Sequence, residues 1–404
     1  MFKKRILPVL ALILVVLVTA GLVFRKELTQ LYHVINLFEE PVIVHNFSHI
    51  NTLIDTVSLP VVEPLNTFGV NPHSLPEQFT YQGTSVSTAD WLAESSTTAL
   101  VVVQGDDIRF EQYYLGTGEF DQRISWSMAK SFLSALFGIA VQEGDIESIE
   151  QAVTDYVPSL KGTGYDGVRI KDVLQMSSGV HFNEDYGDFY SDINRFGRIL
   201  ALGGSFDDFA ASLKRGREPG TYMHYVSIDT HVIGMVLRAA TGREIVDYFD
   251  EKLWSHLGTE RSAYYIVDSQ NQPMVLGGLN MITRDYARFG QLYRDHGQVN
   301  GQQIVPDQWI AASITPDAPH LIPGKRDNAS STLGYGYQWW IPEQADEEFL
   351  ALGIYGQYIY INRKADVVIV KNSADTGFMD NDYESEHLTI AAFRAIVESL
   401  TDAR

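Results

Sequence analysis

Apolar residues fill nearly every position between Met128 and Val141, and Gly144 follows them closely. An α-helix that is apolar on almost every side is usually buried in the middle of a globular domain. Glycine just past the last turn is a common helix stop. The pattern therefore predicts a buried helix that ends at Gly144. Ser127 and Lys130 lie at its start, three positions apart, so a helix places both on one face.

Runs of β-branched and aromatic residues predict strands near both ends of the chain. The first two, at 99–104 and 108–115, flank the short glycine-containing connection 105–107 and read as a hairpin. Later strands are predicted at 334–341, 357–362 and 366–371. Periodic apolar positions predict helices at 170–176, 192–202, 207–214, 229–240, 245–257, 283–296 and 388–400.

This order of elements predicts an α/β (α+β) fold. Strands at both ends with helices between them suggest one central antiparallel sheet built from the two termini, with flanking helices and an inserted, mostly helical lobe. A cleft between two such lobes is a natural place for a site.

Composition narrows the function classes. The chain has 404 residues, 45% of them hydrophobic, which is enough for a large core. A formal net charge of −21 argues against binding nucleic acid and against polybasic attachment to anionic lipid. The absence of cysteine excludes disulfides, a thiolate zinc site and a cysteine nucleophile. We expect neither a metal nor a cofactor, and the oligomeric state is left open.

The N-terminus predicts a membrane segment. Residues 6–24 carry no charge, and Lys3, Lys4 and Arg5 precede them. Such a run is long enough to cross a bilayer, and the basic residues hold its start in the cytoplasm. We expect residues 1–26 to be a single-pass anchor in the cytoplasmic (inner) membrane, with the rest of the chain extracytoplasmic or periplasmic. The alternative is a signal peptide cleaved near 18–21, followed by secretion. Residues 27–75, rich in proline, are expected to form an irregular arm.

Ser127 and Lys130 suggest an activated nucleophile. A serine hydroxyl attacks a carbonyl only when a base removes its proton, and a partly buried lysine can be that base. Backbone N–H groups at a helix N-terminus can stabilise an oxyanion. The alternative is that Ser127 caps the helix while Lys130 reaches solvent. The Ser-x-x-Lys spacing alone is a weak signal.

Two further segments carry candidate groups. Tyr225 and Ser227 are two positions apart, so both point the same way in an extended chain. A cation near a tyrosine can lower its pKa enough for it to act as a base. Gly353 and Gly356 allow a ligand to approach the backbone closely, and amides there could contribute to an oxyanion hole. The alternatives are a core tyrosine and an ordinary glycine bulge.

These three segments, in this order, resemble the motifs of the serine β-lactamase and penicillin-binding-protein superfamily. The motifs are Ser-Met-Ala-Lys at 127–130, Tyr-Val-Ser at 225–227 and the glycine segment 351–357. The resemblance extends from about residue 80 to residue 400 and is to the branch of the class C β-lactamases, their esterase relatives and the 6-aminohexanoate-dimer (nylon-oligomer) hydrolases. Supporting segments lie at 174–179, 277–280 and 285–290.

The resemblance implies a β-lactamase/transpeptidase-like hydrolase domain over 76–404 that works through an acyl-enzyme. Ser127 would attack a small amide or ester, Lys130 and Tyr225 would move protons, and the backbone N–H groups of Ser127 and Ile354 would hold the oxyanion. Which of Lys130 and Tyr225 is the general base stays open. Gly353 and Ser227 would contact the substrate.

The sequence departs from the β-lactamase pattern at two places. Ala351-Leu352-Gly353 stands where those enzymes carry Lys-Thr-Gly, and Ser227 stands where they carry Asn. Both departures weaken the hypothesis that the substrate is a β-lactam or peptidoglycan. The loop 182–192 instead resembles the nylon-oligomer hydrolases, which implies that Tyr186, or less strongly Tyr190, contacts the substrate amide.

The acidic residues of this loop are interpreted as solvated, although they could attract an amine-bearing substrate. These are Glu184, Asp185, Asp188 and Asp192. The alternatives of function are a β-lactamase or D-alanyl carboxypeptidase and, in another class, a non-catalytic envelope protein that binds its ligand in the same cleft.

Overall fold

An eight-stranded sheet forms the frame of the molecule in the computed structural model, which describes residues 3–326 and 331–402. Its strand order is β12-β13-β14-β15-β16-β5-β6-β2. All neighbouring strands are antiparallel except β2 and β6. The strands are β12 (Gly334–Tyr335), β13 (Trp340–Ile341), β14 (Glu348–Gly353), β15 (Gln357–Asn362), β16 (Val367–Ser373), β5 (Thr97–Gln104), β6 (Asp107–Tyr113) and β2 (Gly69–Val70). The expected central sheet built from both ends of the chain is confirmed.

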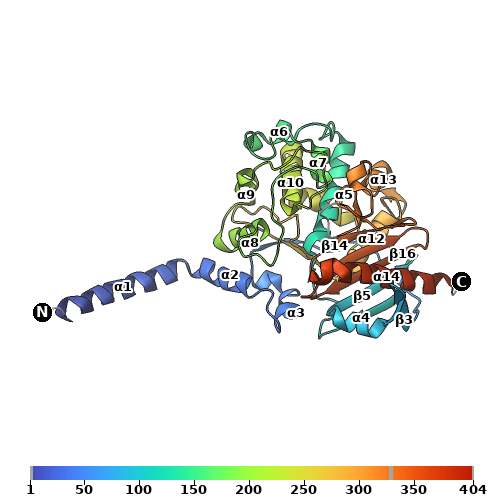
Figure 1. The fold of residues 1–404 in the computed structure, drawn as a ribbon, viewed down its shortest axis with the longest axis horizontal. Coiled ribbons are helices and arrows are strands. Elements are labelled where there is room, and N and C mark those ends of the chain that lie inside the picture. The colour runs from blue at the N-terminus through green and yellow to red at the C-terminus, as the bar shows by residue number, and fades with distance from the viewer. Residues whose placement is uncertain (1–2, 327–330, 403–404) are drawn as a thin grey trace.

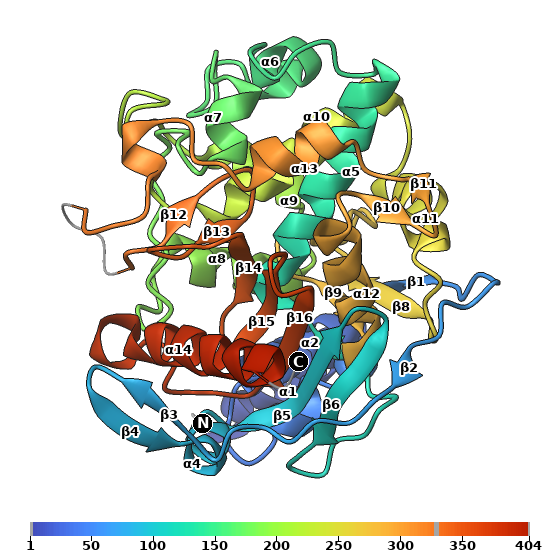
Figure 2. The ribbon, with the colours of Figure 1, turned by 90° about the vertical axis from the view of Figure 1, so that its right-hand side faces the viewer.

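Helices cover both faces of this sheet, as Figure 2 shows for α14 (Asp380–Asp402). In β5, Leu100 and Val102 pack in the core beneath α14, whereas Val101 and Val103 belong to the core on the other face. That second face is covered by α12 (Thr283–Arg294). A strand buried on both faces needs apolar residues at every position, which explains the continuous apolar run in β5.

The helical lobe lies above the sheet in Figure 1 and is centred on α5 (Ala129–Glu143). Twelve residues of α5 are buried, and Gly144 ends the helix with a left-handed φ of 86°. The lobe also contains α6 (Val153–Tyr156), α7 (Ile170–Leu174), α8 (Asp192–Leu202), α9 (Phe206–Ser212), α10 (Ser227–Thr241) and α11 (Ile245–Lys252). The predicted central helix and its glycine stop are confirmed.

The structure adds strands that the sequence pattern did not reveal and divides one that it did. A four-stranded sheet of order β1-β8-β9-β7 lies beside the lobe. The predicted strand 334–341 is in fact two strands, because the chain turns back at Gly336, where a Cβ would lie 1.9 Å from the Ser313 carbonyl oxygen. The remaining elements are β1 (Thr56–Leu59), β3 (Gln78–Tyr81), β4 (Thr84–Ser87), α4 (Thr88–Glu94), β7 (Arg123–Ile124), β8 (Ala263–Ile266), β9 (Leu279–Met281), β10 (Gln298–Val299), β11 (Gln302–Gln303) and α13 (Asp307–Ser313).

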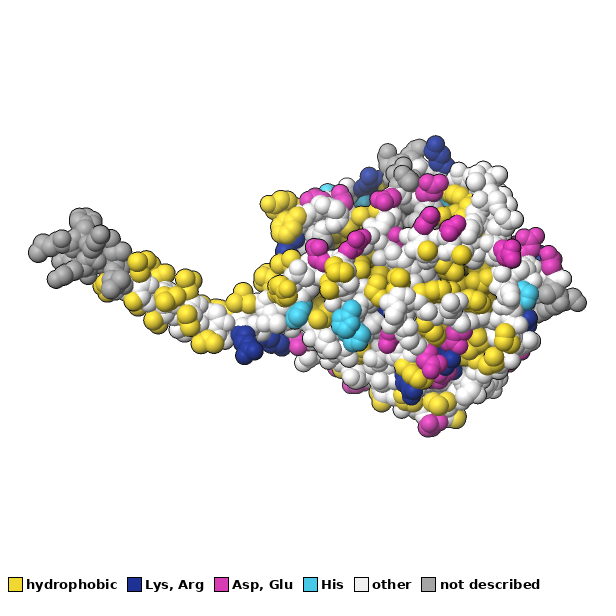
Figure 3. Space-filling model, turned by 90° about the horizontal axis from the view of Figure 1, so that it is seen from below, with side chains coloured by type: hydrophobic (Ala, Val, Ile, Leu, Met, Phe, Trp, Pro, Cys, Tyr) yellow, Lys and Arg dark blue, Asp and Glu magenta, His cyan; other side chains and the backbone are white. Residues whose placement is uncertain are grey.

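The arm is more regular than expected. It contains α2 (Arg25–Ile35) and the short α3 (Ile43–Asn46), and it contributes β1 and β2 to the two sheets. The helix α1 (Lys3–Val23) projects away from the body (Figure 1), and hydrophobic side chains cover much of its described surface (Figure 3). In the described residues, no single helix meets the criteria of length and hydropathy for a membrane span. The pair Pro8–Val23 and Arg25–Ile35 meets them together, with a bend of 73° between them.

Candidate active site

Ser127 lies in a short 3₁₀ turn (Trp126–Met128) that leads directly into α5. Its Oγ accepts a hydrogen bond of 2.9 Å from Lys130 Nζ. The same ammonium or amine group donates to the Leu276 carbonyl oxygen at 2.7 Å and to Ser227 Oγ at 3.3 Å. Because Lys130 is only 1% exposed, it does not reach solvent, and the structure favours a buried Ser–Lys pair over a helix cap.

Burial changes the acid–base behaviour of Lys130. Loss of water around the side chain lowers its pKa to about 7, and the charges of Glu184 and Asp229 act in the opposite direction. A substantial fraction of Lys130 is therefore an uncharged amine near neutral pH. Such an amine, 2.9 Å from a serine hydroxyl, has both the position and the basicity to accept its proton.

Tyr225 comes from the extended segment before α10 and lies close to Lys130. Its ring stacks on Trp340, with centroids 5.3 Å apart, and Lys130 Nζ is 5.2 Å from the Tyr225 ring centroid. Burial raises the Tyr225 pKa, the Glu184 charge raises it further, and a hydrogen bond with Ser127 lowers it. The Tyr225 pKa is therefore raised overall, whereas a neighbouring cation was expected to lower it. Tyr225 is thus a neutral phenol, suited to donating a proton.

The glycine segment packs directly against the serine turn. A Cβ at Gly353 would lie 2.5 Å from the Ser125 carbonyl oxygen and 3.0 Å from the Ser127 nitrogen, so only glycine allows this approach. Ile354 follows, and Ser127, Gly353 and Ile354 line one cavity. Their proximity suits an oxyanion hole made by the N–H groups of Ser127 and Ile354. The segment forms the end of β14 and the turn that leads into β15.

The structure brings Glu184 into the site, and the sequence interpretation of this residue as a solvated loop carboxylate is wrong. Its carboxylate accepts hydrogen bonds from the Ser227 backbone N–H (3.1 Å), from Ser227 Oγ (2.5 Å) and from the Tyr186 hydroxyl (2.8 Å). Tyr186 lines the cavity, whereas Tyr190 is 81% exposed and does not. Only the fold of the loop distinguishes Glu184 from its exposed neighbour Asp185. The spacing of acidic residues in the sequence therefore did not identify Glu184 as a site residue.

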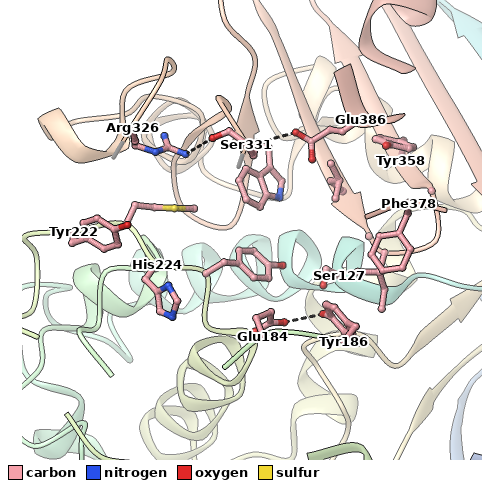
Figure 4. Close-up of a pocket in the computed structure, with 17 residues that line it drawn as sticks. Ser127, Glu184, Tyr186, Tyr222, His224, Arg326, Ser331, Tyr358, Phe378 and Glu386 are labelled. Atoms are coloured by element: carbon pink, nitrogen blue, oxygen red, sulfur yellow. Dashed lines mark hydrogen bonds between the residues drawn. The ribbon is translucent and has the colours of Figure 1, made fainter. Parts of the chain in front are cut away.

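We call the cavity that contains Tyr225 the Tyr225 cavity. Its volume is about 240 Å³. Figure 4 shows Ser127 facing it, with Glu184 and Tyr186 on one side and Arg326, Ser331 and Glu386 on the other. Ser331 Oγ donates to Glu386 at 2.8 Å, and burial raises the Glu386 pKa to about 7. Leu352 lines this cavity where the β-lactamases carry a hydroxyl. Among the described residues, no cluster of three or more His, Asp or Glu side chains could hold a metal ion.

Comparison with known proteins identifies the family of the chain. Residues 94–392 match the Beta-lactamase family. The 6-aminohexanoate-dimer hydrolase of Paenarthrobacter ureafaciens is 28% identical over 291 residues, which cover 70% of this chain and 74% of that protein.

Solved structures show the same fold. A Bacillus anthracis protein classed with the 6-aminohexanoate-dimer hydrolases has a TM-score of 0.78 and 25% identity, covering 89% of this chain and 96% of that one. A penicillin-binding protein of Bacillus halodurans has a TM-score of 0.59 at 14% identity, covering 75% and 99%. The match to the family over most of the chain, and the fold shared with these structures, show that the chain belongs to the β-lactamase family and is a hydrolase of that fold.

Proposed function

We propose that this hydrolase cleaves a small amide or ester through a covalent acyl-enzyme on Ser127. The observation that carries the proposal is the buried pair in which Lys130 Nζ lies 2.9 Å from Ser127 Oγ. Burying a lysine is costly, and Lys130 is buried in direct contact with a serine hydroxyl that lines a cavity. At that position a neutral amine can act as a base, which a purely binding protein would not need.

The reaction follows from the position of each group. Lys130 Nζ takes the Ser127 proton as Oγ bonds to the carbonyl carbon, and the N–H groups of Ser127 and Ile354 stabilise the oxyanion. The Tyr225 phenol gives its proton to the leaving nitrogen or oxygen as the C–N or C–O bond breaks, and it regains a proton from the Lys130 ammonium. Water then attacks the ester carbonyl, releasing the acid and restoring Ser127.

A small amide like that of the 6-aminohexanoate-dimer hydrolases is the favoured substrate class. Two relatives carry that description. Ala351 and Leu352 supply neither the cation nor the hydroxyl that would bind the carboxylate of a β-lactam or a D-alanyl peptide. A β-lactamase or carboxypeptidase activity is therefore disfavoured.

Intact-mass analysis of the full chain after exposure to a fluorophosphonate tests the nucleophile. The expected result is one adduct that is absent from Ser127→Ala. Turnover of p-nitrophenyl butyrate, 6-aminohexanoate dimer and a chromogenic cephalosporin then ranks esterase, amidase and β-lactamase activity. If the folded protein forms no adduct and turns over none of the three, it is a binding protein and the proposal fails.

We also propose that α1 anchors the hydrolase to the cytoplasmic membrane with the catalytic domain outside. Support comes from the uncharged run 6–24 and from apolar side chains that α1 exposes, such as Leu14 (62%) and Leu17 (64%). Replacing both by Asp is expected to release the expressed protein from carbonate-washed membranes without altering its turnover of p-nitrophenyl butyrate. Recovery of the unaltered protein in the soluble fraction would refute the anchor.

A further inference from the structure

A second cavity, which Tyr225 does not line, opens on Ser127. Its volume is about 140 Å³, and we call it the arm cavity because Val34, Leu37, Phe38 and Ile54 of the N-terminal arm form one wall. The other walls come from α8, from Met274 and neighbouring residues before β9, and from the serine turn. Ser127, Tyr186 and Ile354 line both cavities, so the candidate nucleophile stands between them.

The lining of the arm cavity is apolar. Among the described residues that line it, none is charged, and one polar side-chain atom, Trp126 Nε1, is buried without a hydrogen-bond partner. Asn194 Nδ2 donates to the carbonyl oxygens of Tyr186 and Asp188, and Ser227 Oγ donates to Glu184. An apolar cavity of roughly 150 Å³ stays dry and accepts a molecule the size of benzene. The arm cavity therefore suits an uncharged group of about four to six carbons.

The arm is held tightly at this position. The Phe38 ring stacks on Tyr355 (5.1 Å between centroids, 10° between planes) and lies 5.6 Å from the Trp126 ring. Phe47 packs edge-on against both. Trp126 and Tyr355 have left-handed φ values of 42° and 60°, and each is adjacent in sequence to one of the two oxyanion-hole residues. Such conformations cost about 1–3 kcal/mol each and persist only when surrounding packing fixes them. The arm is thus part of the site.

The proposed acyl-enzyme chemistry decides which half of a substrate enters which cavity. Tyr225 lines only the Tyr225 cavity, and a proton donor must lie within hydrogen-bond reach of the leaving atom. The leaving amine or alcohol therefore departs into the Tyr225 cavity. The acyl carbon remains bonded to Ser127 Oγ, and the arm cavity is the other space that opens there.

We infer that the arm cavity is the acyl pocket, and that the N-terminal arm makes the enzyme selective for uncharged acyl groups of about four to six carbons. Within the small amides, a hexanoyl group should therefore be preferred to the acyl half of 6-aminohexanoate dimer, whose terminal amine is charged at neutral pH. This inference rests on the proposed acyl-enzyme mechanism. It assigns substrate selectivity to a segment of the chain outside the catalytic motifs.

Gly197 of α8 offers a direct test because it lines the arm cavity and a Cβ there meets nothing within 4 Å. Gly197→Leu narrows the cavity in a helix that accepts leucine well. Gly118, exposed in the connection after β6 and equally uncrowded, provides the matched control Gly118→Leu. Phe38→Ala, which removes part of the arm's wall, is the reciprocal variant.

The measurement is kcat/KM for p-nitrophenyl acetate, butyrate, hexanoate and octanoate, beside a second series of butyrate esters with different alcohols. In the unaltered protein, kcat/KM should rise about fourfold per methylene buried, up to hexanoate. Gly197→Leu should flatten this rise and leave acetate within about twofold, whereas Gly118→Leu should change nothing. Phe38→Ala should raise octanoate relative to hexanoate.

Two outcomes would overturn the acyl-pocket inference and leave the proposed function standing. In the first, Ser127 forms the adduct but Gly197→Leu keeps the unaltered dependence of kcat/KM on acyl length. In the second, Gly197→Leu changes kcat/KM only in the series of different alcohols. Absence of any fluorophosphonate adduct in the unaltered protein would instead remove the proposed function, and the acyl pocket with it. The two failures are therefore distinguishable in one set of preparations.

Discussion

In the proposed mechanism, Lys130 and Tyr225 divide the proton transfers because the protein interior moves their pKa values in opposite directions. Burial disfavours the charged form of each, which makes lysine a neutral amine at lower pH and keeps tyrosine a neutral phenol to higher pH. Near neutral pH, Lys130 is therefore available as an unprotonated base, and Tyr225 keeps the proton that it can donate. Of the two candidates for the general base, these directions favour Lys130.

The first prediction concerns the pH dependence of kcat/KM. Lys130 is charged and inactive below its pKa of about 7 and neutral above it, so activity should rise with pH through that value. The Glu184 carboxylate stabilises the ammonium, so Glu184→Gln should shift the rise to lower pH.

Glu386 also titrates near pH 7 in the Tyr225 cavity, so Glu386→Gln is the necessary control. Lys130 is not the titrating base if two results are found together. In Glu386→Gln the rise of kcat/KM with pH is lost, and in Glu184→Gln the rise occurs at the same pH as in the unaltered protein.

The second prediction separates the acid from the base. Tyr225→Phe should slow hydrolysis of amides and alkyl esters by roughly 10²–10⁴, because their leaving groups need a proton. p-Nitrophenolate leaves without one, so p-nitrophenyl esters should slow much less. Equal losses for both substrate classes would show that Tyr225 is not the proton donor.

At the scale of elements, the approach of β14 to the serine turn is the most constrained feature. Gly353→Ala would place a methyl group 2.5 Å from the Ser125 carbonyl oxygen, so the strand must move away from Ser127. Losing one oxyanion-hole donor costs roughly 10²–10³ in kcat. We expect a loss of this size with the fold retained, measured by steady-state kinetics and circular dichroism. Gly118→Ala is the control, and near-normal kcat in Gly353→Ala would contradict this oxyanion hole.

Strand β16 carries a second buried lysine, which predicts a pH dependence of stability. Lys371 is fully buried, donates to Ser373 Oγ at 2.5 Å, and has its pKa lowered to about 7 by burial. Between pH 7 and the unfolded pKa of 10.5, the unfolded chain binds a proton that the folded chain lacks, so stability rises with pH. Lys371→Met removes this slope.

Compared with the unaltered protein, Lys371→Met should therefore gain most in unfolding free energy at or below pH 7, and this gain should shrink towards pH 10. Urea melts at pH 6.5, 8 and 9.5 measure it, and a gain independent of pH would contradict the lowered pKa of Lys371.

Features that depend on neighbouring residues were predicted from the sequence, whereas features that depend on contacts between distant residues were not. The all-round apolar pattern and Gly144 predict α5 because helix periodicity and caps are local. The spacing of Ser127 and Lys130 then places both on one face. Glu184 could not be found this way, because its role depends on Ser227, which is remote in sequence. Strands of two to four residues, such as β7 and β9, are too short to show a period.

At the scale of the whole molecule, four separate parts of the chain meet at Ser127: the arm, the serine turn, the lobe with Tyr225 and the glycine end of β14. The sheet built from both ends holds β14 in place, and the helical lobe brings Tyr225 and Glu184 to it. The arm then forms a wall of the second cavity at Ser127, which Tyr225 does not line. The site is therefore a property of the complete fold rather than of one motif.

The most direct test of the account is to trap the acyl-enzyme. Rapid acid quenching of the full chain with p-nitrophenyl hexanoate, followed by peptide mass spectrometry, should find a hexanoyl group on the peptide that contains Ser127. The group should appear with the p-nitrophenol burst and decay at the rate of turnover, and Ser127→Ala should show neither. Hydrolysis that proceeds with no acyl group on Ser127, or with normal turnover in Ser127→Ala, would contradict the mechanism.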